Sequence, residues 1–242
     1  MAKPRDAKVA RDAESFIAKV VPEAALQPKH HEPRRAHNQP TIVQSINPAT
    51  GDLLHEYASA SATEVAEVIN RAWHAQPAWA GLGIRERCKY LGALHQLIFM
   101  KRVEIARQIT LECGKPIAEA LSTEIAIVLD VARFCIRHAE SILKARRLPH
   151  QNIAMKLKSG WQTYEPYGVV AIISPWNYPF MLAMGQTLPA VIAGNCVVHK
   201  PSEYTPGCGA LLHELFAQAG FPENVFQAII GDCATGAALV DA

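Results

Sequence analysis

The sequence predicts an α/β fold, an incomplete doubly wound parallel sheet that carries a β-hairpin arm. Three apolar runs, each followed by a turn and a helical pattern, span Gly168–Ile173, Asn195–Lys200 and Asn224–Ile230. Strands that alternate with helices form parallel sheets with crossover helices, and we expect all three strands to be buried on both faces. A segment of period-two alternation, Ile153–Glu165, precedes them and predicts the hairpin, with its turn at Ser159–Gly160.

Residues 1–40 are expected to form a mobile N-terminal arm. They contain eight Lys and Arg against five acids, and Pro22, Pro28, Pro33 and Pro40 interrupt any regular element. A basic surplus of this size is more typical of a solvated tail than of a binding site.

The elements between the arm and the hairpin are predicted from turn and capping signals. Order is expected to begin near Thr41, with two short strands around the turn residues Asn47 to Gly51. Ser61 and Glu64 have the spacing of a capping box, which predicts a helix to about Ala75. Further helices are expected over 84–100, 103–113 and 117–144, and the second of these ends at Gly114. The last helix has a predicted buried stripe of Ile125, Leu129, Ala132 and Ile136.

The composition is that of an ordinary globular protein and disfavours several classes of function. A formal net charge of +2 argues against nucleic acid or an anionic membrane as the main partner. The longest apolar stretch, Met181–Val198, is interrupted by polar residues and proline, so no membrane span is expected. Six cysteines without a CxxC pair, behind a charged start, favour a cytoplasmic protein with free thiols. The ten histidines show no metal-ligand spacing, and no metal site is expected.

Ligands of parallel sheets bind at the carboxyl ends of the strands, which here are Ser174–Tyr178, Lys200–Glu203 and Gly231–Gly236. In the first, the amide of Asn177 could donate to a developing oxyanion, or it could simply hold the turn between two prolines. In the second, Lys200 and Glu203 suit ribose hydroxyls, or they could form a surface salt bridge. The third is a glycine turn that opens a helix, where free N–H groups could face a pyrophosphate, although it is not a GxGxxG motif.

Taken together, the segments GVVAIISPWNYPF, NCVVHKPSEYTP and GDCATGAALV resemble the front half of the aldehyde dehydrogenase superfamily, and the upstream INPATGD and LECGKP fit the same pattern. The resemblance covers the chain from about Thr41 onward. It implies that Asn177 is catalytic and helps to bind the oxyanion of a thiohemiacetal. It implies a cofactor site formed by Ile173, Ser174, Pro175, Trp176, Lys200, Ser202, Glu203 and Gly231.

The same resemblance implies oxidation of an aldehyde to a carboxylate with NAD, and less readily with NADP, because a carboxylate at Glu203 disfavours a 2′-phosphate. It divides the chain into the arm (1–40), a cofactor-binding domain in two parts (41–152 and 166–242), and a hairpin (153–165). In this family the hairpin mediates oligomerisation, so a homo-oligomer is expected of the intact enzyme.

Two departures from the family pattern bear on function. Cys233 stands where the family usually has glycine, which would crowd the adenine edge of the cofactor. The family's catalytic cysteine and water-activating glutamate have no match up to Ala242, so the chain is expected to be a truncated part and inactive alone. Cys208 and Cys233 lie near predicted helix starts, where a thiol pKa can fall, but we expect all six cysteines to be packing residues. The alternative is a non-catalytic remnant, or a module that binds nucleotide or pairs with other subunits.

Overall fold

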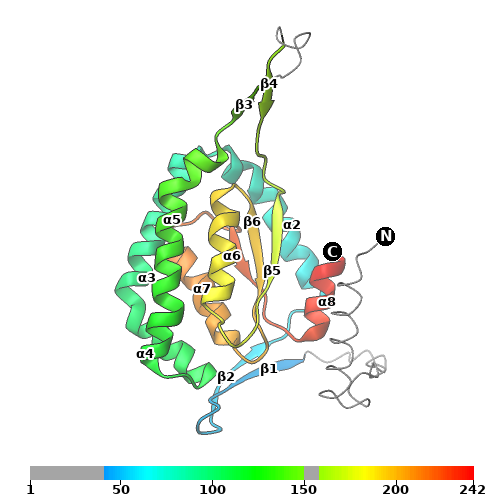
Figure 1. Cartoon of the computed structure of the whole chain (residues 1–242). Coiled ribbons are helices and arrows are strands. Elements are labelled where there is room, and N and C mark those ends of the chain that lie inside the picture. Colours follow the sequence, from blue (N-terminus) through cyan, green and yellow to red (C-terminus); the bar gives the residue numbers. More distant parts are fainter. Residues whose placement is uncertain (1–40, 150–157) are drawn as a thin grey trace, which may run out of the picture. The chain divides into compact units, whose positions relative to one another are not determined.

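A computed structural model describes residues 41–149 and 158–242, which lie within one compact unit, Gln39–Ala242 (Figure 1). The arm predicted over residues 1–40 and the segment 150–157 of the hairpin region lie outside the described residues. No helix in the described ranges is long and apolar enough to cross a membrane.

The predicted parallel sheet is confirmed. Strands β5 (Val169–Ile173), β6 (Cys196–Lys200) and β7 (Phe226–Ala228) pair in parallel in the order β5-β6-β7. The crossover helices α6 (Met181–Ile192) and α7 (Pro206–Gln218) connect these strands. Because all three strands run in one direction, their carboxyl ends lie at the same edge of the sheet, where the polar loops follow.

Burial differs between these strands, and the prediction that all three are buried on both faces is wrong for β5. Every residue of β6 is buried, whereas Ala171 and Ile173 of β5 are exposed, Ile173 by 50%. The reason is position in the sheet: within the described residues β5 pairs with β6 alone, and its other edge is open. An apolar run reveals a strand but not whether that strand is central.

The first strands and the capped helix are confirmed, with one change of length. Strands β1 (Ile42–Ile46) and β2 (Leu53–Ala58) pair antiparallel, and both hydrogen bonds of the Ser61 capping box are present. Helix α2 (Ala62–Gly81) continues beyond the predicted end at Ala75 and passes through Pro77. Burial of Trp79 in the last turn, where its Nε1 donates to the carbonyl of Val191, stabilises the extension.

The helices between Ile84 and Leu143 differ from the prediction at two points. The two expected helices at 84–100 and 103–113 are a single helix, α3 (Ile84–Cys113), because Ile98 and Ile105 are both buried on one continuous face. It ends as predicted at Gly114, which has a φ of 72°. The expected long helix is divided into α4 (Ile117–Glu119), a π-helical segment η2 (Ala120–Ile125) and α5 (Ala126–Leu143).

The stripe predicted on the last of these helices is shifted by the π-helical turn. Ile125 and Ala132 are buried as expected, but Leu129 and Ile136 are only half-buried. Val128, Cys135 and Ala139 occupy the deeper positions instead. Helices α3 and α5 pack on α6 and α7, while α2 packs on the strands and on α8 (Cys233–Asp241) (Figure 1).

A hairpin is present near the predicted place, but its register differs. Strand β3 (Arg146–Leu148) pairs with β4 (Gly160–Gln162), and Gly160 lies opposite Leu148. The prediction of a turn at Ser159–Gly160 is therefore wrong, since Gly160 is a paired strand residue. The first strand, β3, lies before residue 153, outside the segment in which the hairpin was predicted. Residues 153–157 of the predicted hairpin lie outside the described residues.

Candidate functional site

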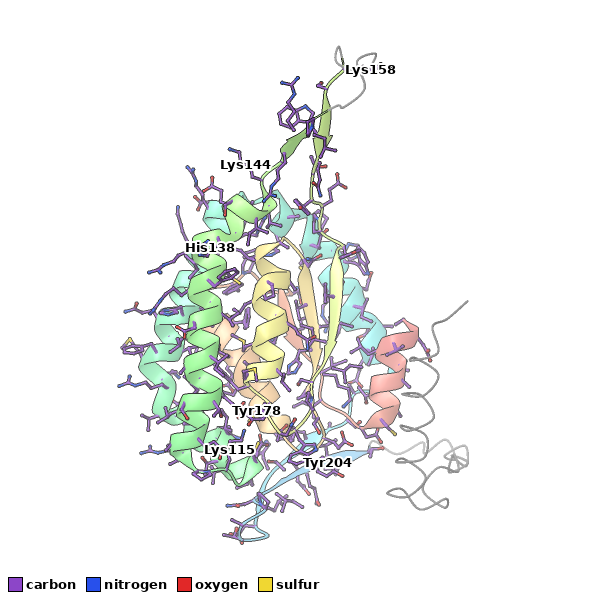
Figure 2. All side chains as sticks on the ribbon, in the orientation of Figure 1. Lys115, His138, Lys144, Lys158, Tyr178 and Tyr204 are labelled. Carbon is purple, nitrogen blue, oxygen red and sulfur yellow. The ribbon has the colours of Figure 1, made fainter. Side chains whose placement is uncertain are left out.

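Three loops follow the parallel strands and border one cavity of about 710 Å³. Each loop contributes a residue to its lining: Trp176 after β5, Glu203 after β6 and Asp232 after β7. Strand β1 lines the opposite wall, together with Glu112 and Cys113 at the end of α3. Figure 2 shows Lys115, Tyr178 and Tyr204 toward this end of the molecule, and the Lys115 ammonium lies over the ring of Tyr178.

The loop after β5, residues Ser174–Phe180, carries Asn177 and is called the Asn177 loop here. Asn177 is exposed, and its side-chain amide makes no hydrogen bond within the described ranges. Other groups hold the turn: the Cys113 thiol donates to the carbonyl of Trp176 at 3.2 Å, and Lys115 Nζ donates to that of Asn177 at 2.8 Å. The side chain of Asn177 is therefore not what maintains the turn between the prolines.

Lys115 also forms a buried ion pair with Glu124, whose Oε1 lies 2.6 Å from Nζ. The other carboxylate oxygen of Glu124 accepts from the backbone N–H groups of Phe180 and Met181, at 2.9 and 3.2 Å. Glu124 lies in the π-helical segment η2, and such segments are frequent at functional sites. Lys115 and Glu124 were not among the predicted site residues. The signals were present, because Lys115 is part of the LECGKP motif and Glu124 interrupts an apolar helical face.

Lys200 and Glu203 form a long ion pair, but its lysine is buried, so it is not a pair between two surface side chains. Lys200 is 3% exposed, its Nζ donates to the carbonyl of Pro201 at 3.0 Å, and Glu203 Oε2 is 4.0 Å away. Burial lowers the pKa of the Lys200 ammonium, and the nearby carboxylates of Glu203 and Asp232 oppose that shift. The result is a cation held below the surface beside a half-exposed carboxylate, at the mouth of the cavity.

Ser174 and Ser202, both predicted cofactor residues, are engaged with the protein. The Ser174 hydroxyl is 2.8 Å from His199 Nε2, and His199 is fully buried on β6. Burial, reinforced by the charge of Lys200, lowers the pKa of His199 to about 3, so the imidazole is neutral. Ser202 accepts from the N–H of Tyr204 and shapes the turn after β6. Ile173, Pro175 and Trp176, which were also predicted, are exposed, and Trp176 lines the cavity.

The glycine turn after β7 does not present free N–H groups, and that part of the prediction is wrong. Asp232 is the N-cap of α8, and its carboxylate accepts from the N–H groups of Ala234 and Thr235. A carboxylate in this position satisfies the helix end that a pyrophosphate would otherwise use. Gly231 is required by packing, since a Cβ atom there would lie 2.0 Å from the hydroxyl oxygen of Thr235.

Glu112 organises the second loop and was also missed from the sequence. Its carboxylate accepts from the Ser45 hydroxyl at 2.5 Å and from the N–H groups of Gly207 and Cys208, at 2.8 and 2.7 Å. It therefore caps α7 directly after the Lys200–Glu203 loop. Burial and the charge of Glu112 raise the pKa of the Cys208 thiol well above its usual range. The helix start does not lower this pKa, because a carboxylate already occupies the helix end, and Cys208 is a buried packing residue as expected.

The pKa values of four other buried or half-buried thiols are raised as well. Burial raises the pKa of Cys113 and of Cys196 to about 12, and it also raises those of Cys88 and Cys135. Cys233 is exposed at the start of α8. Among the residues that the structure describes, no group of three or more His, Cys, Asp or Glu side chains could hold a metal ion.

Comparison with known proteins agrees with this arrangement. The model of the aldehyde dehydrogenase family matches residues 35–242. The chain belongs to the aldehyde dehydrogenase family. The 4,4′-diapolycopene aldehyde oxidase of Methylomonas sp is 35% identical to it over 202 residues, which are 84% of this chain and 38% of that protein. The chain spans about two-fifths of the length of the curated relatives it matches, at 38% and 40%.

Solved structures of aldehyde dehydrogenases and related enzymes share the fold. A methylmalonate-semialdehyde dehydrogenase from Sinorhizobium meliloti 1021, complexed with NAD, superimposes with a TM-score of 0.78 at 28% identity. The match covers 86% of this chain and 41% of that chain. An NADP-dependent enzyme of E. coli superimposes with a TM-score of 0.75 at 32% identity, over 81% of this chain and 40% of that chain. One of these two structures is described with NAD and the other with NADP. Similarity to the family therefore does not decide between NAD and NADP for this chain.

Proposed function

We propose that this chain forms the cofactor-binding part of an NAD-dependent aldehyde dehydrogenase that oxidises an aldehyde to a carboxylate. The observation that carries the proposal is the exposed amide of Asn177 at the end of β5, in a loop whose shape is maintained by Lys115, Cys113 and Glu124 instead. A side chain that is not needed to hold its own turn is available to a substrate.

In the proposed reaction Asn177 donates a hydrogen bond to the oxyanion that forms when a thiolate of the intact enzyme attacks the aldehyde. One donor of this kind contributes about 3–4 kcal/mol in a site that excludes water. The bound nicotinamide would accept the hydride. The loop also places Trp176, 53% exposed, against the cavity, where its ring can cover a ligand.

The adenosine ribose fits the end of β6. A ribose diol both donates and accepts, which suits an ammonium and a carboxylate that lie 4.0 Å apart, the carboxylate in the lining of the cavity. A 2′-phosphate at the same place would lie beside the carboxylate of Glu203, and like charges at short range repel. The carboxylate of Glu203 therefore favours NAD over NADP. The capped start of α8 does not fit a pyrophosphate, because the carboxylate of Asp232 already occupies it.

The experiment is a calorimetric titration of the chain with NAD, NADP and ADP-ribose. We expect NAD and ADP-ribose to bind more tightly than NADP, and the variant Glu203→Gln to narrow that difference by about ten-fold, equal to about 1.4 kcal/mol. The matched control is Glu223→Gln, because Glu223 is exposed in the loop that precedes β7, at the opposite end of the strand. Equal affinities for NAD and NADP, unchanged by Glu203→Gln, would refute the assignment.

A second candidate is a non-catalytic module that binds nucleotide or pairs with another subunit. The open edge of β5 favours it, because an unpaired strand edge with exposed apolar residues is suited to pairing. Both candidates allow nucleotide binding. They differ in whether the intact protein oxidises an aldehyde.

A further inference from the structure

The backbone of the Asn177 loop is held on both sides of Asn177 by two side chains from other elements. On one side Lys115 Nζ donates to the carbonyl of Asn177 itself, at 2.8 Å. On the other side Glu124 accepts from the N–H groups of Phe180 and Met181. The two side chains are joined by their own ion pair, so the contacts form one connected set.

Lys115 is held in a single position. Its ammonium has three partners: Glu124 Oε1 at 2.6 Å, the carbonyl of Asn177 at 2.8 Å, and the ring of Tyr178, whose centroid is 4.0 Å from Nζ. Its side chain is 10% exposed, so solvent and salt screen these contacts little. A cation with this many short partners restricts the residues on both sides of the Asn177–Tyr178 peptide bond.

Glu124 is held equally firmly. Its side chain is fully buried, and Oε2 accepts from the N–H groups at the start of α6 while Oε1 meets Lys115. The π-helical segment around it changes the direction of successive side chains. As a result this carboxylate points to the loop from a buried face whose other residues, Ala120 and Ile125, are apolar. A cap for α6 alone would not need the lysine, which contacts the loop three residues before the capped N–H of Phe180.

From this geometry we propose that Lys115 and Glu124 are positioning residues that fix the direction of the Asn177 side chain for the reaction. The proposal rests on the proposed role of Asn177 as oxyanion donor. A small displacement of a donor from the place where charge develops lowers the rate sharply, about 100-fold for 1 Å. Within the described ranges, Lys200 and Glu203, the proposed adenosine-binding residues, make no hydrogen bond or ion pair with Lys115 or Glu124, so we expect adenosine binding to be independent of that pair.

The experiment uses the 242-residue chain and compares Lys115→Met, Glu124→Gln and the double variant with the wild type. The double variant leaves no unpaired buried charge, which keeps the test valid if a single variant fails to fold. The matched control is Lys89→Met. It removes an exposed ion pair of similar length on α3, Lys89–Glu86 at 2.7 Å.

The readouts are amide hydrogen exchange at Phe180 and Met181 and the NMR signal of the Asn177 side-chain amide, assigned by its loss in Asn177→Asp. In the Lys115 and Glu124 variants we expect exchange to accelerate about ten-fold or more and the Asn177 signal to shift or broaden. The affinity for adenosine diphosphate should stay within about two-fold of wild type, a pattern that general destabilisation would not produce. Lys89→Met should change none of these.

An unchanged Asn177 signal and unchanged loop exchange in a folded Lys115→Met or double variant would overturn the proposal. Failure of the wild-type chain to bind NAD or adenosine diphosphate would instead contradict the proposed function, and the exchange data would still report on the pair. The two failures are therefore distinguishable.

Discussion

At the scale of single residues, the buried ionic groups of this chain bind main-chain atoms of distant elements. Glu112 and Glu124 each accept from two backbone N–H groups at a helix start, and Arg87 donates to the carbonyls of Ala80, Leu82 and Ile192. Backbone partners leave no mark in the sequence, which explains why Asn177 and Lys200 were found by the strand-end rule while Glu112 and Glu124 were not. A buried acid inside an apolar helix pattern is the available signal.

His199 should make the protein less stable in acid. Its folded-state pKa of about 3 lies below its ordinary value of 6.5, so the unfolded chain binds the proton more readily between these values. Stability is present above pH 6.5 and is lost as the pH falls toward 3, at about 1.4 kcal/mol per pH unit from this residue. Urea unfolding between about pH 7 and about pH 5 measures the slope. His199→Gln should reduce that slope by this amount, and an identical slope would contradict the assignment.

The thiols should differ widely in reactivity. Cys233 is exposed, whereas Cys135, Cys196 and Cys208 are buried and have raised pKa values. Because the thiolate is the reactive form, we expect iodoacetamide at about pH 8 to label Cys233 first and the buried three only as the protein opens. Peptide mass spectrometry follows each site. Labelling of Cys208 as fast as that of Cys233 would show that the start of α7 is not closed.

At the scale of elements, features that depend on residues close in sequence were predicted correctly, and features that depend on long-range contacts were not. The capping box of α2, the stop at Gly114 and the three parallel strands follow from residues close in sequence, and all are confirmed. Three other features depend on contacts with residues distant in sequence: the extension of α2 through Pro77, the unbroken α3 and the open edge of β5. The π-helical turn η2 has no local sequence signal and shifted the predicted stripe.

Gly168, directly before β5, should tolerate no side chain. Its φ is 113°, and a Cβ atom would lie 2.3 Å from the ring of Trp73. We expect Gly168→Ala to lower the free energy of unfolding by roughly 2–4 kcal/mol, through backbone strain and overpacking. The control is Gly185→Ala within α6. A Cβ atom added there would meet no atom within 4 Å outside its own stretch of helix, and alanine should stabilise the helix by about 0.5–1 kcal/mol. Denaturant melts compare the two, and a neutral Gly168→Ala would contradict the packing argument.

At the scale of the whole molecule, apolar side chains are exposed on and beside β5, the strand with an open edge within the described residues. Ile173 and Trp176 are half exposed, and Tyr167 before β5 is 91% exposed. We predict that the isolated chain self-associates or binds hydrophobic dyes, because unpaired strand edges and apolar patches promote association. Size-exclusion chromatography with light scattering and a thermal melt test this. A monodisperse monomer that melts cooperatively above about 50 °C would count against it.

The chain assayed by itself should not oxidise aldehydes. The chemistry needs a thiolate beside the nicotinamide, and burial raises the pKa of five of its cysteines: Cys88, Cys113, Cys135, Cys196 and Cys208. We expect no aldehyde-dependent NADH formation with aliphatic, aromatic or semialdehyde substrates. Turnover above a no-protein control that Cys233→Ala abolishes would overturn this prediction.

The carboxylate of Glu112 connects β1, α3 and α7, so the stability of each of these elements depends on the other two. It holds Ser45 of β1 and the first N–H groups of α7 at once, so any displacement of Glu112 releases both β1 and the start of α7. Because α7 begins directly after the loop of Lys200 and Glu203, the free energy of nucleotide binding at that loop should be shared with β1. A ligand bound at that loop would then suppress the local opening of β1 as well, which is linkage between separate elements without any change of shape.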